Sequence, residues 1–263
     1  MKIAISGKGG VGKTVLASLL STVFVESGYS VLAIDADPNS NLAVTLGFPD
    51  PNKITPISEM ADLIEERTGA RPGELATFFK VNPKVDDIPE RFCLEYNGIK
   101  LMVMGRLKQG GTGCYCPESA LLEALVTHLL LERKEVVIMD MEAGVEHLNR
   151  GTAKAVDDMI IVVEPSKRSI ETAYRIRALA EDIGLQNIEV VGSKIRSDQE
   201  KDSLISSMPG FEFLGFIPYD EGIVEADLVG LPLVNSSQRV KSEVEDIAAR
   251  IIEPKLYRTA KKN

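Results

Sequence analysis

Apolar residues along this chain follow two alternating patterns, which together predict the fold class. Short apolar or β-branched runs predict buried strands at residues 2–6, 30–35, 99–104, 135–140, 158–163, 188–193 and 213–217. Apolar residues at helical spacing predict helices after residue 14 and at about 117–131, 168–184, 197–207 and 238–252. Strands that alternate with helices imply right-handed crossovers and a mostly parallel sheet with helices on both faces. We therefore expect a single α/β domain over residues 1–263.

The segment 49–90 fits this alternation least well. Prolines interrupt it and leave only short helical patterns, at about 57–67 and 73–80. We expect an irregular helical insertion packed beside the sheet. The next two apolar stretches, 91–95 and 99–104, flank Asn97-Gly98, which is typical of a hairpin turn. We expect the second arm to be a central strand.

The first predicted strand leads into Gly7-Lys8-Gly9-Gly10-Val11-Gly12-Lys13-Thr14, which matches G-x-x-x-x-G-K-[ST] between a strand and a helix. In such a loop the backbone N–H groups surround phosphate oxygens, and the helix N-terminus adds its positive dipole end. We expect phosphate contacts from Gly9, Gly10, Val11 and Gly12. Lys13 would reach the β- and γ-phosphates and Thr14 would hold Mg²⁺. The sequence thus predicts a phosphate-binding P-loop.

Acidic residues end two of the other predicted strands. Asp35 and Asp37 follow the second strand, and Asp140 ends the strand 135–140. Ligands of open α/β sheets bind at the carboxyl ends of the strands, so these carboxylates should gather near the loop. We expect Asp35 to order the hydration shell of the metal, Asp37 to orient the attacking water, and Asp140 to act as the Walker B acid. Residues 141–147 follow as a candidate switch segment, with Gly144 as its pivot.

Composition narrows the class of protein. Thirty basic against thirty-nine acidic residues leave a net charge of −9, which argues against broad nucleic-acid binding. No apolar run approaches the roughly 20 residues that a membrane span requires. The chain starts with a strand and a glycine loop rather than a signal peptide, and its three cysteines suit a reducing compartment. We expect a cytoplasmic protein without a membrane partner.

Cys114-Tyr115-Cys116 forms a second candidate site. In an extended backbone, residues two apart point to the same side, so both thiols can face one metal such as Zn²⁺, Ni²⁺ or Cu⁺. One such motif supplies only two of the four ligands that tetrahedral zinc needs. A two-fold dimer would supply the other two from the same motif of its second copy. Alternatively, His147, His128 or Cys93 of the same chain completes the site, although Cys93 also fits a buried packing role.

The loop GKGGVGKT, with its second lysine, resembles the deviant Walker A loop of the ParA, MinD and nitrogenase iron protein superfamily. The resemblance implies that Lys8 crosses a dimer interface to the nucleotide of the partner. DADPNSN, which contains Asp37, resembles the switch I segment of the same superfamily. Ile217-Pro218-Tyr219-Asp220 resembles its Pro-x-Asp segment, which implies that Pro218 packs on the base and Asp220 accepts a ribose or base hydrogen bond. Ser193 and Arg196 replace Asn and Asp of the guanine motif Asn-Lys-x-Asp, so ATP is favoured.

Taken together, GKGGVGKT, DADPNSN, GCYC and DMEAGVEHL resemble the CooC family of nickel-insertion ATPases, which mature carbon monoxide dehydrogenase. The accessory ATPase of acetyl-CoA synthase is closely similar. The resemblance implies an ATP-hydrolysing homodimer in which Cys114 and Cys116 of both subunits share one Ni²⁺ or Zn²⁺. It also implies an apo-enzyme as client.

Two other functions remain open. An electron donor of the nitrogenase iron protein type would need a cluster cysteine shortly after the acidic strand end, and residues 140–151 contain none. Cys114 and Cys116 of two chains could still hold a [4Fe–4S] cluster. A positioning ATPase of the ParA or MinD type would need basic DNA contacts or a C-terminal membrane helix. The net charge disfavours the first, and the tail 254–263 has few large apolar residues.

Overall fold

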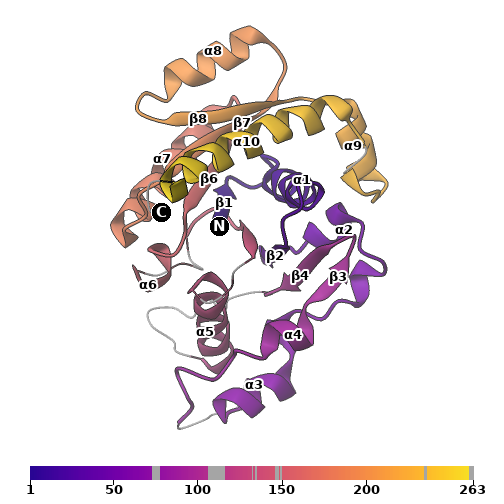
Figure 1. Cartoon of the computed structure of the whole chain (residues 1–263), viewed down its shortest axis with the longest axis vertical. Coiled ribbons are helices and arrows are strands. Elements are labelled where there is room, and N and C mark those ends of the chain that lie inside the picture. The colour runs from indigo at the N-terminus through magenta and orange to yellow at the C-terminus, as the bar shows by residue number, and fades with distance from the viewer. Residues whose placement is uncertain are drawn as a thin grey trace.

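A single sheet organises the chain (Figure 1). The computed structural model describes residues 1–72, 78–105, 116–131, 133, 135–145, 148, 150–233 and 236–260. Within these ranges the sheet has eight strands, in the order β3-β4-β2-β5-β1-β6-β7-β8. The strands are β1 (Lys2–Gly7), β2 (Val31–Ala36), β3 (Leu94–Tyr96), β4 (Ile99–Val103), β5 (Val136–Met141), β6 (Asp158–Val163), β7 (Ile188–Ile195) and β8 (Glu212–Pro218). Of the strand pairs in the described part of the chain, only β3–β4 is antiparallel, so the expectation of a mostly parallel sheet is confirmed.

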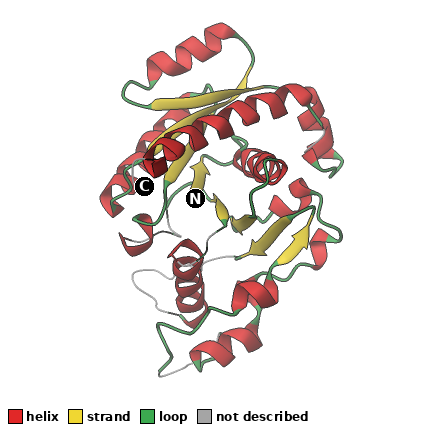
Figure 2. Cartoon of the chain, viewed as in Figure 1, coloured by secondary structure: helices red, strands yellow, loops and turns green. Residues whose placement is uncertain are grey.

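Helices cover both faces of this sheet (Figure 2). One face packs against α1 (Lys13–Glu26), α2 (Leu42–Leu46) and α10 (Gln238–Ala260). The other packs against α3 (Ala61–Thr68), α4 (Ile88–Phe92), α5 (Pro117–Leu131), α6 (Arg150–Ala153), α7 (Lys167–Ile183) and α8 (Asp198–Ser207). Helix α9 (Glu221–Leu228) follows β8. Burial on both faces explains why the central strands read as continuous apolar runs.

Strand β6 illustrates how one run of residues serves two cores. Met159, Ile161 and Val163 belong to the core under α5 and α7. Ile160 and Val162, between them, belong to the core under α1 and α10. All five side chains are fully buried. The period-two alternation of a strand therefore fills both layers, and the carboxyl end of the sheet is left for the loops.

The segment 49–90 and the hairpin depart from the predicted boundaries. The predicted helix at 57–67 is split into a short 3-10 turn, Ile57–Glu59, and α3. Of the predicted helix at 73–80, residues 73–77 lie outside the described residues and 78–80 are not helical. The predicted first hairpin arm at 91–95 is wrong at its start, because Arg91 and Phe92 end α4 and the strand begins at Leu94. A proline in the first turn of α4 favours the helix there.

Candidate functional site

The loop between β1 and α1 lies at the carboxyl end of the sheet, as the sequence predicts. Gly7 ends β1 so close to β6 that a Cβ would lie 2.5 Å from the carbonyl oxygen of Val162. Gly12 precedes α1 with φ of +101°, a left-handed conformation that glycine adopts without strain. Between them, Val11 is fully buried in the core under α1. Glycines at 7 and 12 therefore allow the tight turn, and Val11 anchors it.

Lys13 and Thr14 open α1 and each faces a carboxylate. The Lys13 side chain is buried, and its Nζ lies 3.9 Å from Asp37 Oδ2. The Thr14 hydroxyl donates a 2.7 Å hydrogen bond to Asp140 Oδ2 at the end of β5. Asp37 also accepts a hydrogen bond from the backbone N–H of Asn39. The structure thus brings four of the predicted site residues together, although they are separated by up to 127 positions in the chain.

Asp35 and Asp140 lie side by side on β2 and β5, where they are direct register partners. Burial, together with the charge of Asp140, raises the pKa of Asp35 to about 7. Burial also raises the pKa of Asp140 to about 6, although the Thr14 hydroxyl and the Lys13 charge oppose the shift. Asp35 accepts backbone hydrogen bonds from Leu42 and Asp37. Within the described part of the chain, neither carboxylate has a close cation partner.

These side chains fit a magnesium ion beside the loop. Asp140 is almost completely buried, yet its Oδ1 atom has no hydrogen-bond partner among the described residues. An unpaired buried carboxylate oxygen is costly unless a cation or water satisfies it. Thr14 adds a hydroxyl oxygen next to the same carboxylate. Oxygen atoms of this kind are the ligands that Mg²⁺ prefers.

Lys8, the second lysine of the loop, is held within its own chain. Its Nζ donates a 2.9 Å hydrogen bond to Glu164 Oε1, just after β6. Ser166, the N-cap of α7, donates its hydroxyl to the same oxygen. Burial alone would raise the pKa of Glu164, but the hydrogen bonds from Lys8 and Ser166 lower it. Glu164 was not among the predicted site residues, although it also follows directly after an apolar strand.

Lys194 on β7, the residue after Ser193, also belongs to this cluster. Its Nζ donates a 2.5 Å hydrogen bond to the carbonyl oxygen of Gly10 and lies 4.0 Å from Glu164 Oε2. Lys194 itself adopts a left-handed backbone conformation, with φ of +58°. It therefore braces the loop from β7 and places a second cation near Glu164.

Ser6 links the loop strand to the candidate switch segment. Its hydroxyl lies 2.7 Å from the Glu142 carbonyl and 2.9 Å from the Gly144 carbonyl, and it accepts the Gly144 N–H at 3.1 Å. Of the predicted segment 141–147, residues 146 and 147 lie outside the described residues. Ser6 was another residue that sequence reasoning missed, because the contact joins positions 138 residues apart.

Pro218 and Asp220 lie three strands from the loop, because β6 and β7 separate β8 from β1. Asp220 is the N-cap of α9, and its Oδ1 accepts the Ile223 N–H at 3.3 Å. Its Oδ2 accepts the Ser237 hydroxyl at 2.7 Å. Asp220 thus performs a local structural task that connects α9 to the start of α10. Its predicted role toward a ribose or base stays a prediction.

The cysteine loop is described only at its end. Cys114 and His147 lie outside the described residues. Cys116 immediately precedes α5, where its carbonyl accepts the Ala120 N–H and its Sγ lies 3.0 Å from the Ser119 hydroxyl. Cys93 packs against the core, and burial raises the pKa of its thiol to about 11. Among the described residues, no group of three or more His, Cys, Asp or Glu side chains is arranged to hold a metal ion.

None of the described helices is long and apolar enough to cross a bilayer.

Comparison with known proteins identifies relatives along the whole chain. The profile of the CobQ/CobB/MinD/ParA nucleotide binding domain matches residues 2–233. The carbon monoxide dehydrogenase accessory protein CooC of Rhodospirillum rubrum is 44% identical over 255 residues, which cover 96% of this chain and 97% of that protein. An uncharacterized ATP-binding protein of Methanocaldococcus jannaschii is 46% identical over 257 residues, 97% of this chain and 99% of that protein.

Solved structures show the same fold. The MinD cell division protein of Aquifex aeolicus matches with a TM-score of 0.68 at 23% identity, over 96% of this chain and 97% of that one. A MinD protein of Pyrococcus horikoshii in complex with Mg-ADP matches with a TM-score of 0.65 at 19% identity, over 97% and 96%. At this identity the likeness concerns the fold alone.

Proposed function

This chain belongs to the CobQ/CobB/MinD/ParA family of nucleotide-binding proteins, and from that premise we propose that it is an ATP-hydrolysing nickel chaperone. It dimerises on ATP and inserts nickel into apo carbon monoxide dehydrogenase or a related nickel enzyme, such as acetyl-CoA synthase. The full-length similarity to CooC supports the choice of client. We further propose that residues 1–263 form one ATPase domain with 49–90 as its insertion, and that the protein acts in the cytoplasm.

The observation that carries the ATPase proposal is the unpaired Oδ1 atom of buried Asp140 beside Thr14 at the phosphate loop. Thr14 and Asp140 would hold Mg²⁺, with Asp35 behind them. When bound, Mg²⁺ supplies positive charge that offsets the charge on the phosphates. Lys13, which is buried and 3.9 Å from Asp37, supplies a second positive charge to the phosphates. The loop residues Gly9, Gly10, Val11 and Gly12 contribute their backbone N–H groups.

Asp37 is the proposed water-orienting group. Its carboxylate is mostly buried but reaches solvent, and it lies next to the Lys13 ammonium. It can accept a hydrogen bond from a water molecule and align that water for attack on the terminal phosphate. Pro218 and Asp220 are proposed to bound the adenosine. The Pro218 ring offers an apolar surface to the base.

Lys8 is the proposed sensor of the partner subunit. In the single chain its ammonium is bound to Glu164, so it must leave this carboxylate before it can reach a nucleotide in another subunit. The nucleotide phosphates carry more negative charge than one carboxylate, and this difference would drive the exchange. Breaking this one partly exposed ion pair costs about 1 kcal/mol. The contact therefore sets a low threshold for dimerisation.

Cys114 and Cys116 of two subunits are proposed to hold one nickel or zinc ion as cargo. Thiolates suit both metals. Because each chain supplies two sulfurs, four ligands are present only in the dimer. Coupling then follows from geometry: an ATP-driven change in subunit pairing assembles or opens the metal site.

The test is metal analysis of freshly reduced, anaerobically purified protein, alongside its mass in ATP and in ADP. The proposal predicts one nickel or zinc ion per dimer and its loss in Cys114→Ser/Cys116→Ser. The matched control, Cys93→Ser, should keep the metal. Unchanged metal content in the double variant contradicts the shared site. A broad visible absorbance of an iron–sulfur cluster would instead favour the electron-donor function.

A further inference from the structure

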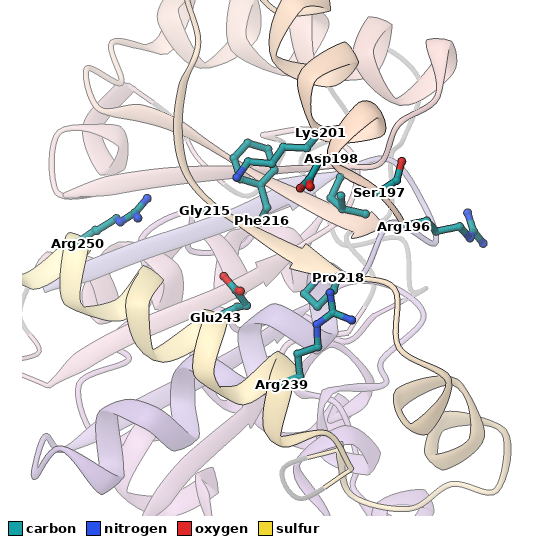
Figure 3. Close-up of a pocket in the computed structure, with 11 residues that line it drawn as sticks. Arg196, Ser197, Asp198, Lys201, Gly215, Phe216, Pro218, Arg239, Glu243 and Arg250 are labelled. Atoms are coloured by element: carbon teal, nitrogen blue, oxygen red, sulfur yellow. The ribbon is translucent and has the colours of Figure 1, made fainter.

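Strand β8 is the last strand of the described sheet and pairs only with β7. Its other edge faces a groove of about 400 Å³ between α8 and α10 (Figure 3). Arg250 on α10 donates a 2.6 Å hydrogen bond to the Leu214 carbonyl, so this carbonyl already has a partner and an added strand would replace Arg250 there. Among the described residues no strand pairs with this second edge, and the backbone of an edge strand can pair with another extended chain. The groove therefore offers a strand edge with which a bound peptide could form backbone hydrogen bonds.

The charge of this groove is opposite to that of the whole chain. Four basic and two acidic side chains line it: Arg196, Lys201, Arg239, Arg250, Asp198 and Glu243. In the part of the chain that the structure describes, none of the four cations forms an ion pair with a carboxylate. The chain as a whole carries −9. Basic side chains without carboxylate partners are thus concentrated at this edge of an acidic protein.

Two of these cations are preorganised by neighbouring aromatic rings. The Lys201 ammonium lies 4.7 Å from the centre of the Phe216 ring, which stacks on Phe213. The Arg196 guanidinium lies 4.4 Å from the centre of the Tyr219 ring. Such contacts hold a cation in place without neutralising its charge. In Figure 3, Lys201 lies above β8, whereas Arg239 extends from α10 below it toward Pro218.

From these observations we infer that the edge of β8 binds an extended, acidic segment of a partner protein. The segment adds as a further strand along β8, and its carboxylates contact Lys201 on one side and Arg239 on the other. Strand addition supplies backbone hydrogen bonds, and the cations supply the preference for acidic side chains. A nucleic acid could bind the basic side chains but could not pair with the backbone of β8. An acidic peptide can do both, so it fits the groove better. The inference does not depend on the nickel chaperone function.

The probe is a fluorescent eight-residue peptide made of two Glu-Glu-Thr-Thr repeats, and its binding is followed by anisotropy at low salt. Two adjacent glutamates in a strand point to opposite faces, so this peptide presents carboxylates to both sides of β8. Lysine in place of glutamate reverses its charge. Proline in place of threonine keeps its charge but removes the N–H groups needed for strand pairing. We expect the glutamate–threonine peptide to bind, and both altered peptides to bind at least about tenfold more weakly.

The matched variants are Lys201→Glu/Arg239→Glu and the control Arg175→Glu, an exposed arginine of α7. The double variant should weaken peptide binding about tenfold, and the control should change it less than about twofold. Both should keep the cooperative unfolding transition of the unaltered protein, which shows that they fold. Equal loss in the control, absence of binding by the unaltered protein, or tighter binding of a single-stranded oligonucleotide overturns the inference. One further outcome overturns the inference: the double variant binds the peptide as well as the unaltered protein does, but self-associates. The cations would then serve only to prevent edge-to-edge pairing between copies of this chain.

Discussion

Strands β1 and β5 are neighbours, and the charged side chains at their amino ends differ from those at their carboxyl ends in how they are paired. At the amino end, buried Lys2 donates to the carbonyls of Arg133 and Glu135. The Glu135 carboxylate in turn is bound by Arg133 and lies 3.7 Å from Lys100. At the carboxyl end, buried Lys13 lies 3.9 Å from the Asp37 carboxylate, and Asp140 Oδ1 has no hydrogen-bond partner among the described residues.

The pKa values record the same contrast. Burial alone would raise the pKa of Glu135, but its bonds to Arg133 lower it to about 2. Burial raises the pKa of Asp140 to about 6, since no comparable cation offsets it. At the amino end the charged side chains are paired within the chain, so they stabilise the fold. At the carboxyl end the charged side chains are available to a ligand, and this arrangement lowers the stability of the unliganded protein.

The two buried lysines give the largest expected difference. Lys13→Ala should weaken ATP binding roughly 100-fold, about 3 kcal/mol, because a buried cation near the phosphates is lost. Lys2→Ala should leave the affinity unchanged and lower the free energy of unfolding instead. Calorimetric titration and chemical unfolding measure the two quantities. Retained affinity in Lys13→Ala contradicts the phosphate-loop role.

Removing the cation at the amino end should affect stability alone. Arg133→Ala leaves half-buried Glu135 without its main partner and should lower the free energy of unfolding by about 2 kcal/mol. Its bond to Glu90 is lost as well. ATP hydrolysis per folded molecule should remain within about twofold. If Arg133→Ala loses ATP hydrolysis but not stability, the amino end contributes to activity, and the proposed difference between the amino and carboxyl ends is wrong.

Lys8 is the exception at the carboxyl end, because it is already paired. Lys8→Ala should prevent dimerisation with a non-hydrolysable ATP analogue. Glu164→Gln should favour it by up to about fivefold, since roughly 1 kcal/mol of ion pair need not be broken. Analytical ultracentrifugation measures both, with exposed Glu171→Gln on α7 as the control. If Glu164→Gln dimerises less readily than the control, Glu164 supports the dimer rather than restraining Lys8.

The smallest effect is a pH dependence. The folded-state pKa of Glu135 is about 2, below its usual 4.5, so its contribution to stability is present above pH 4.5 and is lost as pH falls toward 2. Glu135→Gln should therefore lower the free energy of unfolding by about 1 kcal/mol at pH 7 and by less at pH 3. Unfolding titrations at several pH values test this, with exposed Glu245→Gln as reference. A difference that stays constant with pH contradicts the assignment.

Sequence patterns predicted this site better where it is local. The apolar runs of β1, β2 and β5 end in the P-loop, Asp35 and Asp140, so strand pattern and chemistry point to the same edge. Asp37 comes two residues after Asp35, and Thr14 comes at the end of the loop that follows β1. The fold class followed equally well, because strands buried on both faces leave continuous apolar runs.

Contacts between distant segments were not predictable in this way. Glu164 follows an apolar strand just as Asp140 does, but its partner Lys8 is 156 residues away and becomes its neighbour only because β6 lies beside β1. The contacts of Ser6 and Lys194 depend on sheet order for the same reason. The start of the hairpin was misplaced because Arg91 to Glu95 alternates like a strand, whereas Pro89 and fully buried Ile88 stabilise a short helix.

The central claim is that Asp140 Oδ1, which has no partner among the described residues, is available to a metal–nucleotide complex. Asp140→Asn tests this claim most directly. The measurement is the free energy of unfolding of both proteins without ligand, with ATP, and with ATP and Mg²⁺. Asparagine removes a buried charge, so the unliganded variant should be more stable by about 1–3 kcal/mol and should lose the added stabilisation by Mg²⁺. A variant that is less stable without ligand, or that Mg²⁺ stabilises as much as the unaltered protein, would contradict the claim.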